Sequence, residues 1–147
     1  MTHAPDRPLW TCPACGRPFA NRNQPHSCVA APVDEHLRGK GERAEALYRR
    51  FEEAARECGP VVLAPVKTRI GFQVRMIFAA VTVRADRLDG HVVLARRLEH
   101  PRFTRIESLS PRNHVHHFRL RDPAGIDDEV RGWLREAYAV GEQRHLG

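Results

Sequence analysis

Four residues able to bind a metal ion lie within the first 28 positions of the chain. The segment "CPACG" separates Cys12 from Cys15 by two residues, and "HSC" separates His26 from Cys28 by one. A Cys-x-x-Cys turn lets two thiolates reach one ion, and alternate residues of an extended segment point to the same side. Zinc takes four such ligands in a tetrahedron. The spacing therefore predicts a zinc site on Cys12, Cys15, His26 and Cys28.

The ligand set leaves alternatives open. His3 or His36 could replace His26, and the cysteines could instead be free thiols of a polar leader. The His-x-Cys half is tighter than the spacing of common zinc fingers, so the type of zinc fold stays open. A site with four protein ligands is closed, whereas catalytic zinc keeps one position for water. We therefore expect the zinc to be structural.

Helical and extended patterns follow this segment. Apolar residues recur at helical spacing from Ala44 to Cys58, which makes Cys58 a buried apolar side chain, and Gly59 and Pro60 end the helix. A second helix begins at Asp127 or Asp128 and ends near Gly141. Short β-rich runs between the helices predict strands at residues 61–66, 70–74, 76–83, 91–98, 103–109 and 114–120.

The short connections between these strands favour antiparallel neighbours, because parallel strands need long crossovers. The predicted fold class is α+β: a zinc-binding module at residues 1–32, followed by an α+β domain at residues 33–147. That domain contains a helix, an antiparallel meander of five or six strands and a C-terminal helix.

Positive charge gathers in the predicted sheet. The chain has a net charge of +6, yet residues 61–121 alone hold 12 basic and 4 acidic residues, a difference of +8. All but one of the twelve are arginine, whose planar guanidinium suits bidentate contact with phosphate. A basic sheet face predicts nucleic-acid binding through the phosphate backbone without sequence reading, and a solvated face is the alternative. The predicted contact residues are Lys67, Arg69, Arg75, Arg97, Arg102, Arg105 and Arg119.

A histidine pair offers a different function. In "HVHHF" the side chains of His114 and His116 continue an apolar strand face. They could line a pocket with Lys67 and Arg69, act as a general base, or bind a second metal with Glu107. More often such histidines are hydrogen-bonded at the rim of a core. The alternatives to nucleic-acid binding are thus an enzyme or small-ligand binder, and a protein-interaction adaptor.

Several familiar signatures are missing from the sequence. It contains no Gly-rich phosphate loop, no Gly-x-Ser-x-Gly and no His-Glu-x-x-His, so a non-enzymatic binding module is the leading hypothesis. The first residues lack the apolar run of a signal peptide, and the longest apolar stretch, at residues 76–83, is too short for a bilayer. We expect a cytoplasmic protein with no membrane partner, with nucleic acid or another protein as the partner.

Five segments carry a resemblance to a known family: "WTCPACGRPFANRNQPHSC", "KTRIGFQVRMIFAA", "LDGHVVLARRLEHPRFTRIE", "HVHHFRLR" and "IDDEVRGWLREAYAVG". Through them the chain resembles a bacterial domain-of-unknown-function family, number 5655. It implies an N-terminal zinc-binding segment on Cys12, Cys15, His26 and Cys28, followed by a small α+β domain. It implies no activity, substrate or catalytic residue.

Overall fold

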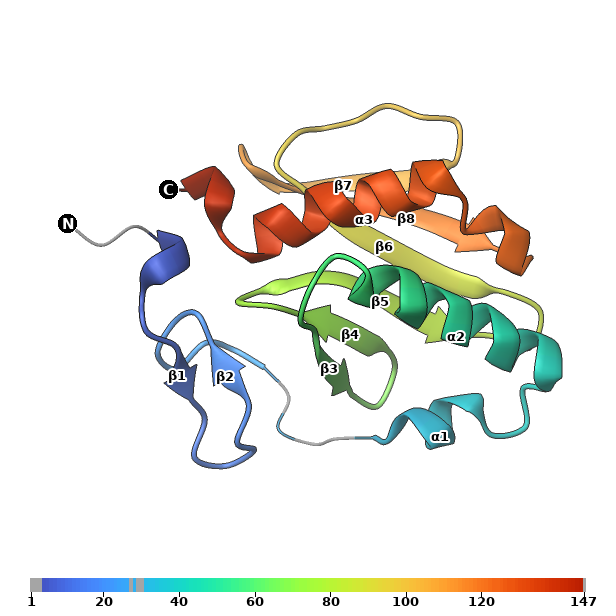
Figure 1. Ribbon diagram of the computed structural model, residues 1–147, viewed down its shortest axis with the longest axis horizontal. Coiled ribbons are helices and arrows are strands. Elements are labelled where there is room, and N and C mark those ends of the chain that lie inside the picture. The colour runs from blue at the N-terminus through green and yellow to red at the C-terminus, as the bar shows by residue number, and fades with distance from the viewer. Residues whose placement is uncertain (1–3, 27, 29–30, 147) are drawn as a thin grey trace.

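Two long helices cover one face of a six-stranded antiparallel sheet in the computed structural model, which describes residues 4–26, 28 and 31–146 (Figure 1). A small two-stranded hairpin precedes this layer pair. The predicted α+β class is therefore confirmed. The helices are α1 (Val33–Leu37), α2 (Glu42–Arg56) and α3 (Asp128–Gly141), with 3-10 turns η1 (Ala4–Asp6), η2 (Pro123–Gly125) and η3 (Arg144–Leu146). The strands are β1 (Trp10–Thr11), β2 (Pro18–Phe19), β3 (Val62–Pro65), β4 (Ile70–Gln73), β5 (Ile77–Val83), β6 (Leu88–Leu94), β7 (Phe103–Ser110) and β8 (Asn113–Leu120).

Both long helices form because their apolar residues share one side. In α2, Leu47 and Phe51 are buried, and in α3, Val130 and Leu134 are buried one turn apart. The side chain of Asp127 caps α3 by accepting a hydrogen bond from the Val130 backbone N–H at 3.1 Å. The predicted start and end of this helix are thus correct, and its apolar side rests on the sheet.

The strand order is β3-β4-β5-β6-β8-β7, so the predicted simple meander is wrong at its last two strands. β6 pairs with β8 and β7 forms the sheet edge. Burial explains the order: alternate residues of β8 are buried, whereas no residue of β7 is. The link between Leu94 and Phe103 is long enough to carry β7 past the position of β8. β6 also lies earlier than the predicted 91–98, because Leu88 fills the core.

The two faces of the sheet differ in character. The face beneath α2 and α3 is apolar and includes Phe72, Val92 and Phe118. The opposite face carries the alternate residues of the same strands, among them Thr82 and Asp89, and we call it the open face. No helix in the described part of the chain is long and apolar enough to cross a membrane.

Candidate metal centre and basic trough

The N-terminal hairpin, which we call the knuckle (residues 10–28), is built around a tight turn. β1 pairs with β2, bringing Trp10 opposite Phe19. Beyond the strands, the Cys12 N–H donates to the Arg17 carbonyl at 3.0 Å and the Gly16 N–H donates to the Cys12 carbonyl at 2.8 Å. Gly16 has φ +74°, a conformation that glycine adopts without a side-chain clash. The turn therefore holds both cysteines of "CPACG" on one side.

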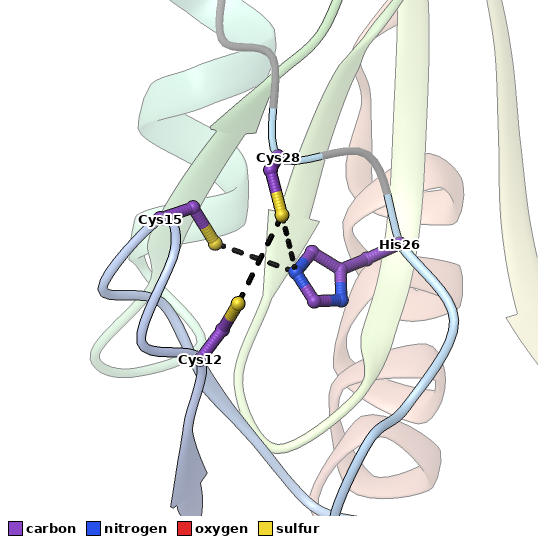
Figure 2. Close-up of side chains that lie close together, drawn as sticks. All are labelled: Cys12, Cys15, His26 and Cys28. Atoms are coloured by element: carbon purple, nitrogen blue, oxygen red, sulfur yellow. Dashed lines mark hydrogen bonds between the residues drawn. The ribbon is translucent and has the colours of Figure 1, made fainter.

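The four predicted ligands converge (Figure 2). The sulfur atoms of Cys12 and Cys28 are 3.8 Å apart, and His26 Nε2 lies 3.4 Å from Cys15 Sγ and 3.3 Å from Cys28 Sγ. All four donor atoms lie within 4.8 Å of one another. No other group of three or more such residues with metal-binding spacing occurs in the described ranges. This Cys₃His cluster could hold one metal ion.

The histidine is oriented by its surroundings. His26 Nδ1 donates to the Gln24 carbonyl oxygen at 2.6 Å, which fixes the tautomer that presents the Nε2 lone pair to the thiols. Phe19 stacks on the imidazole with ring centroids 4.0 Å apart and is itself 1% exposed. The aromatic contact replaces the core that so small a hairpin lacks. His36 lies in α1 outside the cluster, and His3 lies outside the described residues.

Two of the thiols have shifted acidity. Hydrogen bonding from the Cys15 backbone lowers the pKa of the Cys12 thiol to about 6, so its thiolate forms readily. The hydrogen bond with Cys12 raises the pKa of Cys28 to about 11. The thiolate is the form that binds metal. The Cys12 sulfur is therefore ready to act as a ligand at neutral pH.

The knuckle is anchored to the sheet through Gln73. This β4 side chain is 0% exposed, and its amide nitrogen donates to the Pro18 carbonyl of β2. Its amide oxygen accepts a hydrogen bond from Arg17 at 3.3 Å. A metal bound at the knuckle would thus stabilise a hairpin that is packed onto the rest of the molecule.

Three adjoining hollows form a basic trough next to the open face. The hollow beside α1 has a volume of about 490 Å³, the central one about 180 Å³ and the one over β8 about 350 Å³. Thr82 is shared by the first two, and Asp89, Gly90 and His117 by the last two. The charged and polar lining of the whole trough includes Glu35, His36, Lys40, Lys67, Thr68, Arg69, Thr82, Arg84, Asp89, His91, Thr104, Arg105, His117 and Arg119.

The seven basic residues predicted to contact phosphate divide into two groups. Four of them line the trough: Lys67, Arg69, Arg105 and Arg119. Arg105 and Arg119 come from β7 and β8, and Lys67 and Arg69 come from the loop between β3 and β4. The sheet pairing brings this loop and these strands to the same side of the molecule. Four of the seven residues therefore lie along one surface path, and their contact with phosphate stays a prediction.

The other three serve contacts elsewhere. Arg75 donates to a side chain beyond the end of α3, and Arg97 binds a carboxylate in its own loop at 2.7 Å. Arg102 lies over the Trp133 ring, 5.4 Å from its centroid, and donates to Asp127 at 3.1 Å. Arg102 thus fixes the beginning of α3 and does not line the trough.

The pocket predicted around His114, His116 and Glu107 does not form. His116 is 0% exposed in the core, where its Nε2 accepts a hydrogen bond from the Leu98 N–H at 2.9 Å. His114 is 9% exposed and contacts Ser108 at 2.8 Å. Glu107 instead contacts His117, whose side chain points to the open face. His114 and His116 lie on the sheet face that α2 and α3 cover. They are therefore buried beside the apolar side chains of that face.

Sequence reasoning missed a second histidine pair. His91 of β6 and His117 of β8 are direct cross-strand partners and both line the trough. The alternation in "HVHHF" already separates His117 from its two neighbours. The partner could not be read from the sequence, because it depends on β8 inserting between β6 and β7.

The fold and site define a Cys/His hairpin that could hold a metal ion, joined to a helix-covered antiparallel sheet. A family model described as a domain of unknown function (DUF5655) matches residues 33–141, and the chain belongs to that family. No curated protein matches the chain. No solved structure matches it either.

Proposed function

We propose that the knuckle holds one structural zinc ion. Zinc–sulfur bonds of about 2.3 Å and zinc–nitrogen bonds of about 2.0 Å give tetrahedral edges of roughly 3.8 Å between sulfurs and roughly 3.6 Å between sulfur and nitrogen. The sulfur atoms of Cys12 and Cys28 are 3.8 Å apart, and His26 Nε2 lies 3.4 Å from Cys15 Sγ and 3.3 Å from Cys28 Sγ. Three thiolates and one imidazole fill all four positions, so the ion would stabilise the hairpin and leave no position for substrate.

We further propose that the basic trough binds the phosphate backbone of nucleic acid without reading base sequence. The observation that carries this proposal is the joining of three hollows into one path lined by six lysine and arginine side chains, against Glu35 and Asp89 as the acidic lining residues. From β5 to β7 the path crosses three strand spacings, about 14 Å. That length accommodates more than one phosphate of a single strand.

The charges in the trough are only partly neutralised within the protein. Lys67 and Arg69 make no ion pair within residues 4–26, 28 and 31–146. Arg119 is 3.7 Å from Asp89, a carboxylate that Arg84 and Arg87 share. Exposed pairs of this kind contribute little to folding, so their guanidinium groups remain available to phosphate.

A salt titration with mixed-sequence single- and double-stranded probes tests the proposal. Each phosphate contact releases a counterion, so four contacts with duplex DNA should cost about a hundredfold in affinity between roughly 50 and 200 mM salt. In the double variant Arg69→Gln with Arg119→Gln, the slope of log affinity against log salt concentration should become shallower by about one to two units.

A matched double variant removes the same charge elsewhere. Arg97→Gln with Arg144→Gln leaves the trough intact, since Arg97 and Arg144 bind carboxylates outside it. We expect this control to bind as the unmodified protein does. Equal losses in both double variants would show that net charge, not the trough, determines binding. Absence of binding to either probe at low salt would overturn the proposal.

A further inference from the structure

Two histidines face each other at the centre of the basic trough. His91 and His117 are paired in register across β6 and β8, with ring centroids 5.3 Å apart and an interplanar angle of 62°. Arg69 lines the same central hollow. Two imidazoles beside a guanidinium are the groups needed to hold one phosphate and to move protons on either side of it.

His117 is oriented by a carboxylate. Its Nε2 lies 2.6 Å from Glu107 Oε1 and 3.4 Å from a guanidinium nitrogen of Arg105. Nε2 can donate to the carboxylate or accept from the guanidinium, and the shorter distance favours donation to Glu107. Arg105 then binds the same carboxylate oxygen at 2.9 Å. This arrangement holds the ring through Nε2 and leaves Nδ1 of His117 directed away from the carboxylate contact.

His91 has the opposite environment. Burial lowers the pKa of His91 to about 4, and the positive charges of His117 and Arg69 act in the same direction, while Glu107 opposes them. Among the described residues, neither ring nitrogen of His91 has a hydrogen-bond partner, and neither is an enclosed unsatisfied atom. His91 is therefore a neutral imidazole with a free lone pair beside a carboxylate-bound imidazole.

We propose that His91 and His117 are the general base and general acid of an RNA-cleaving site. This inference rests on the proposed binding of a phosphate backbone in the trough. His91 takes the proton of a ribose 2′-hydroxyl, whose oxygen forms a bond to the adjacent phosphorus. The bond from phosphorus to the 5′-oxygen breaks, and that oxygen takes a proton from His117. The products are a 2′,3′-cyclic phosphate and a 5′-hydroxyl.

The substrate class follows from the balance of this step. The 2′-hydroxyl supplies the nucleophile. His91 gains one proton and His117 loses one, so the reaction needs no further reactant. Arg69 contributes positive charge where the phosphorane gains negative charge. DNA lacks the 2′-hydroxyl and can only bind. Glu107 acts as a positioning residue, because it holds His117 and touches no reacting atom.

The test incubates the full chain with an end-labelled RNA oligonucleotide, the same sequence as DNA, and the same sequence as 2′-O-methyl RNA. We expect cleavage of RNA alone, with cyclic phosphate ends identified by mass spectrometry. His117→Ala and His91→Ala should each lower the rate by about 10² to 10⁴ while the Kd for DNA changes little. Arg97→Gln, prepared in the same way, should cleave at the unmodified rate.

The positioning role and the protonation states have their own readouts. Glu107→Gln should lower kcat with KM nearly unchanged, and Glu107→Asp should restore part of the rate. Below about pH 4 the rate should fall, because His91 then carries a proton. Equal RNA cleavage by the unmodified protein and by the double variant His91→Ala with His117→Ala would overturn the inference. Tight binding of RNA without cleavage would overturn it too, and leave the binding proposal standing.

Discussion

The side-chain amide of Gln73 donates a hydrogen bond to the backbone carbonyl of Pro18, 55 positions earlier in the chain. Gln73 is fully buried, and Arg17 donates to its other amide atom. One β4 side chain thus satisfies backbone and side-chain groups of the knuckle. A change that loosens the knuckle should therefore also loosen β4 at this contact, and the reverse.

Replacing Gln73 with leucine should uncouple the two parts. The Pro18 carbonyl would lose its partner at a partly buried position, a loss that costs about 1 kcal/mol. We expect a lower free energy of unfolding in urea and faster release of metal to a chelator. Gln24→Ala is the control, because among the residues that the structure describes this side chain accepts a hydrogen bond only from the Asn21 N–H. Unchanged metal release in Gln73→Leu would contradict the coupling.

Cys12→Ser should abolish stoichiometric zinc binding. The unmodified chain should contain one zinc per molecule by elemental analysis, because the four ligands are complete. The variant should lose order in the knuckle while the sheet stays folded, as shown by a retained cooperative unfolding transition in urea. Cys58→Ser is the control, since Cys58 packs beside the core. Full zinc content in Cys12→Ser would contradict the assigned ligand set.

Two glycines of α3 should respond oppositely to alanine. A Cβ at Gly141 would lie 2.8 Å from Val74 Cγ1 and 3.1 Å from the Met76 carbonyl oxygen, so the helix end must move away from β5. We expect Gly141→Ala to destabilise by about 1–3 kcal/mol. A Cβ at Gly132 meets only Arg135, at 3.8 Å, and Gly132→Ala should stabilise by about 0.5–1 kcal/mol. Thermal unfolding of both variants measures the difference, and equal effects would contradict the close helix–sheet contact.

Buried histidines should make folding stability depend on pH. Burial lowers the pKa of His116 below its ordinary value of 6.5. Below pH 6.5 the unfolded chain therefore binds a proton that the folded chain does not, and stability falls as pH falls toward the folded-state pKa. His116→Gln keeps an acceptor for the Leu98 N–H and removes the titration. Urea unfolding at about pH 7 and about pH 5 should show a smaller loss in the variant. Parallel losses would assign the pH dependence to other groups.

The knuckle was predictable because its information is local. Short spacings in the sequence limit where the donor atoms of Cys12, Cys15, His26 and Cys28 can lie. The tetrahedral coordination of zinc limits how these four atoms can be arranged. The helices were predictable for a similar reason, since the spacing of Leu47 and Phe51 defines one apolar side. Their boundaries agree with the capping residue Asp127 and the stop at Gly59.

The trough could not be predicted from the same kind of reasoning. Strand alternation correctly placed His114 and His116 on one face and His117 on the other. It could not say which face the helices cover. It also assumed that β7 lies next to β6 in the sheet, and these strands carry Arg105 and His91. The actual order puts His117 between them, and only that order creates the trough as it stands.

Side-chain NMR of arginine tests most directly the proposal that the basic trough binds nucleic acid. The Nε–H signals of Arg69, Arg105 and Arg119 should shift when a short mixed-sequence single strand is added at low salt. The signals of Arg49, Arg96 and Arg144, which lie outside the trough, should stay in place. Shifts confined to this second group, or no shift in either group, would contradict the account.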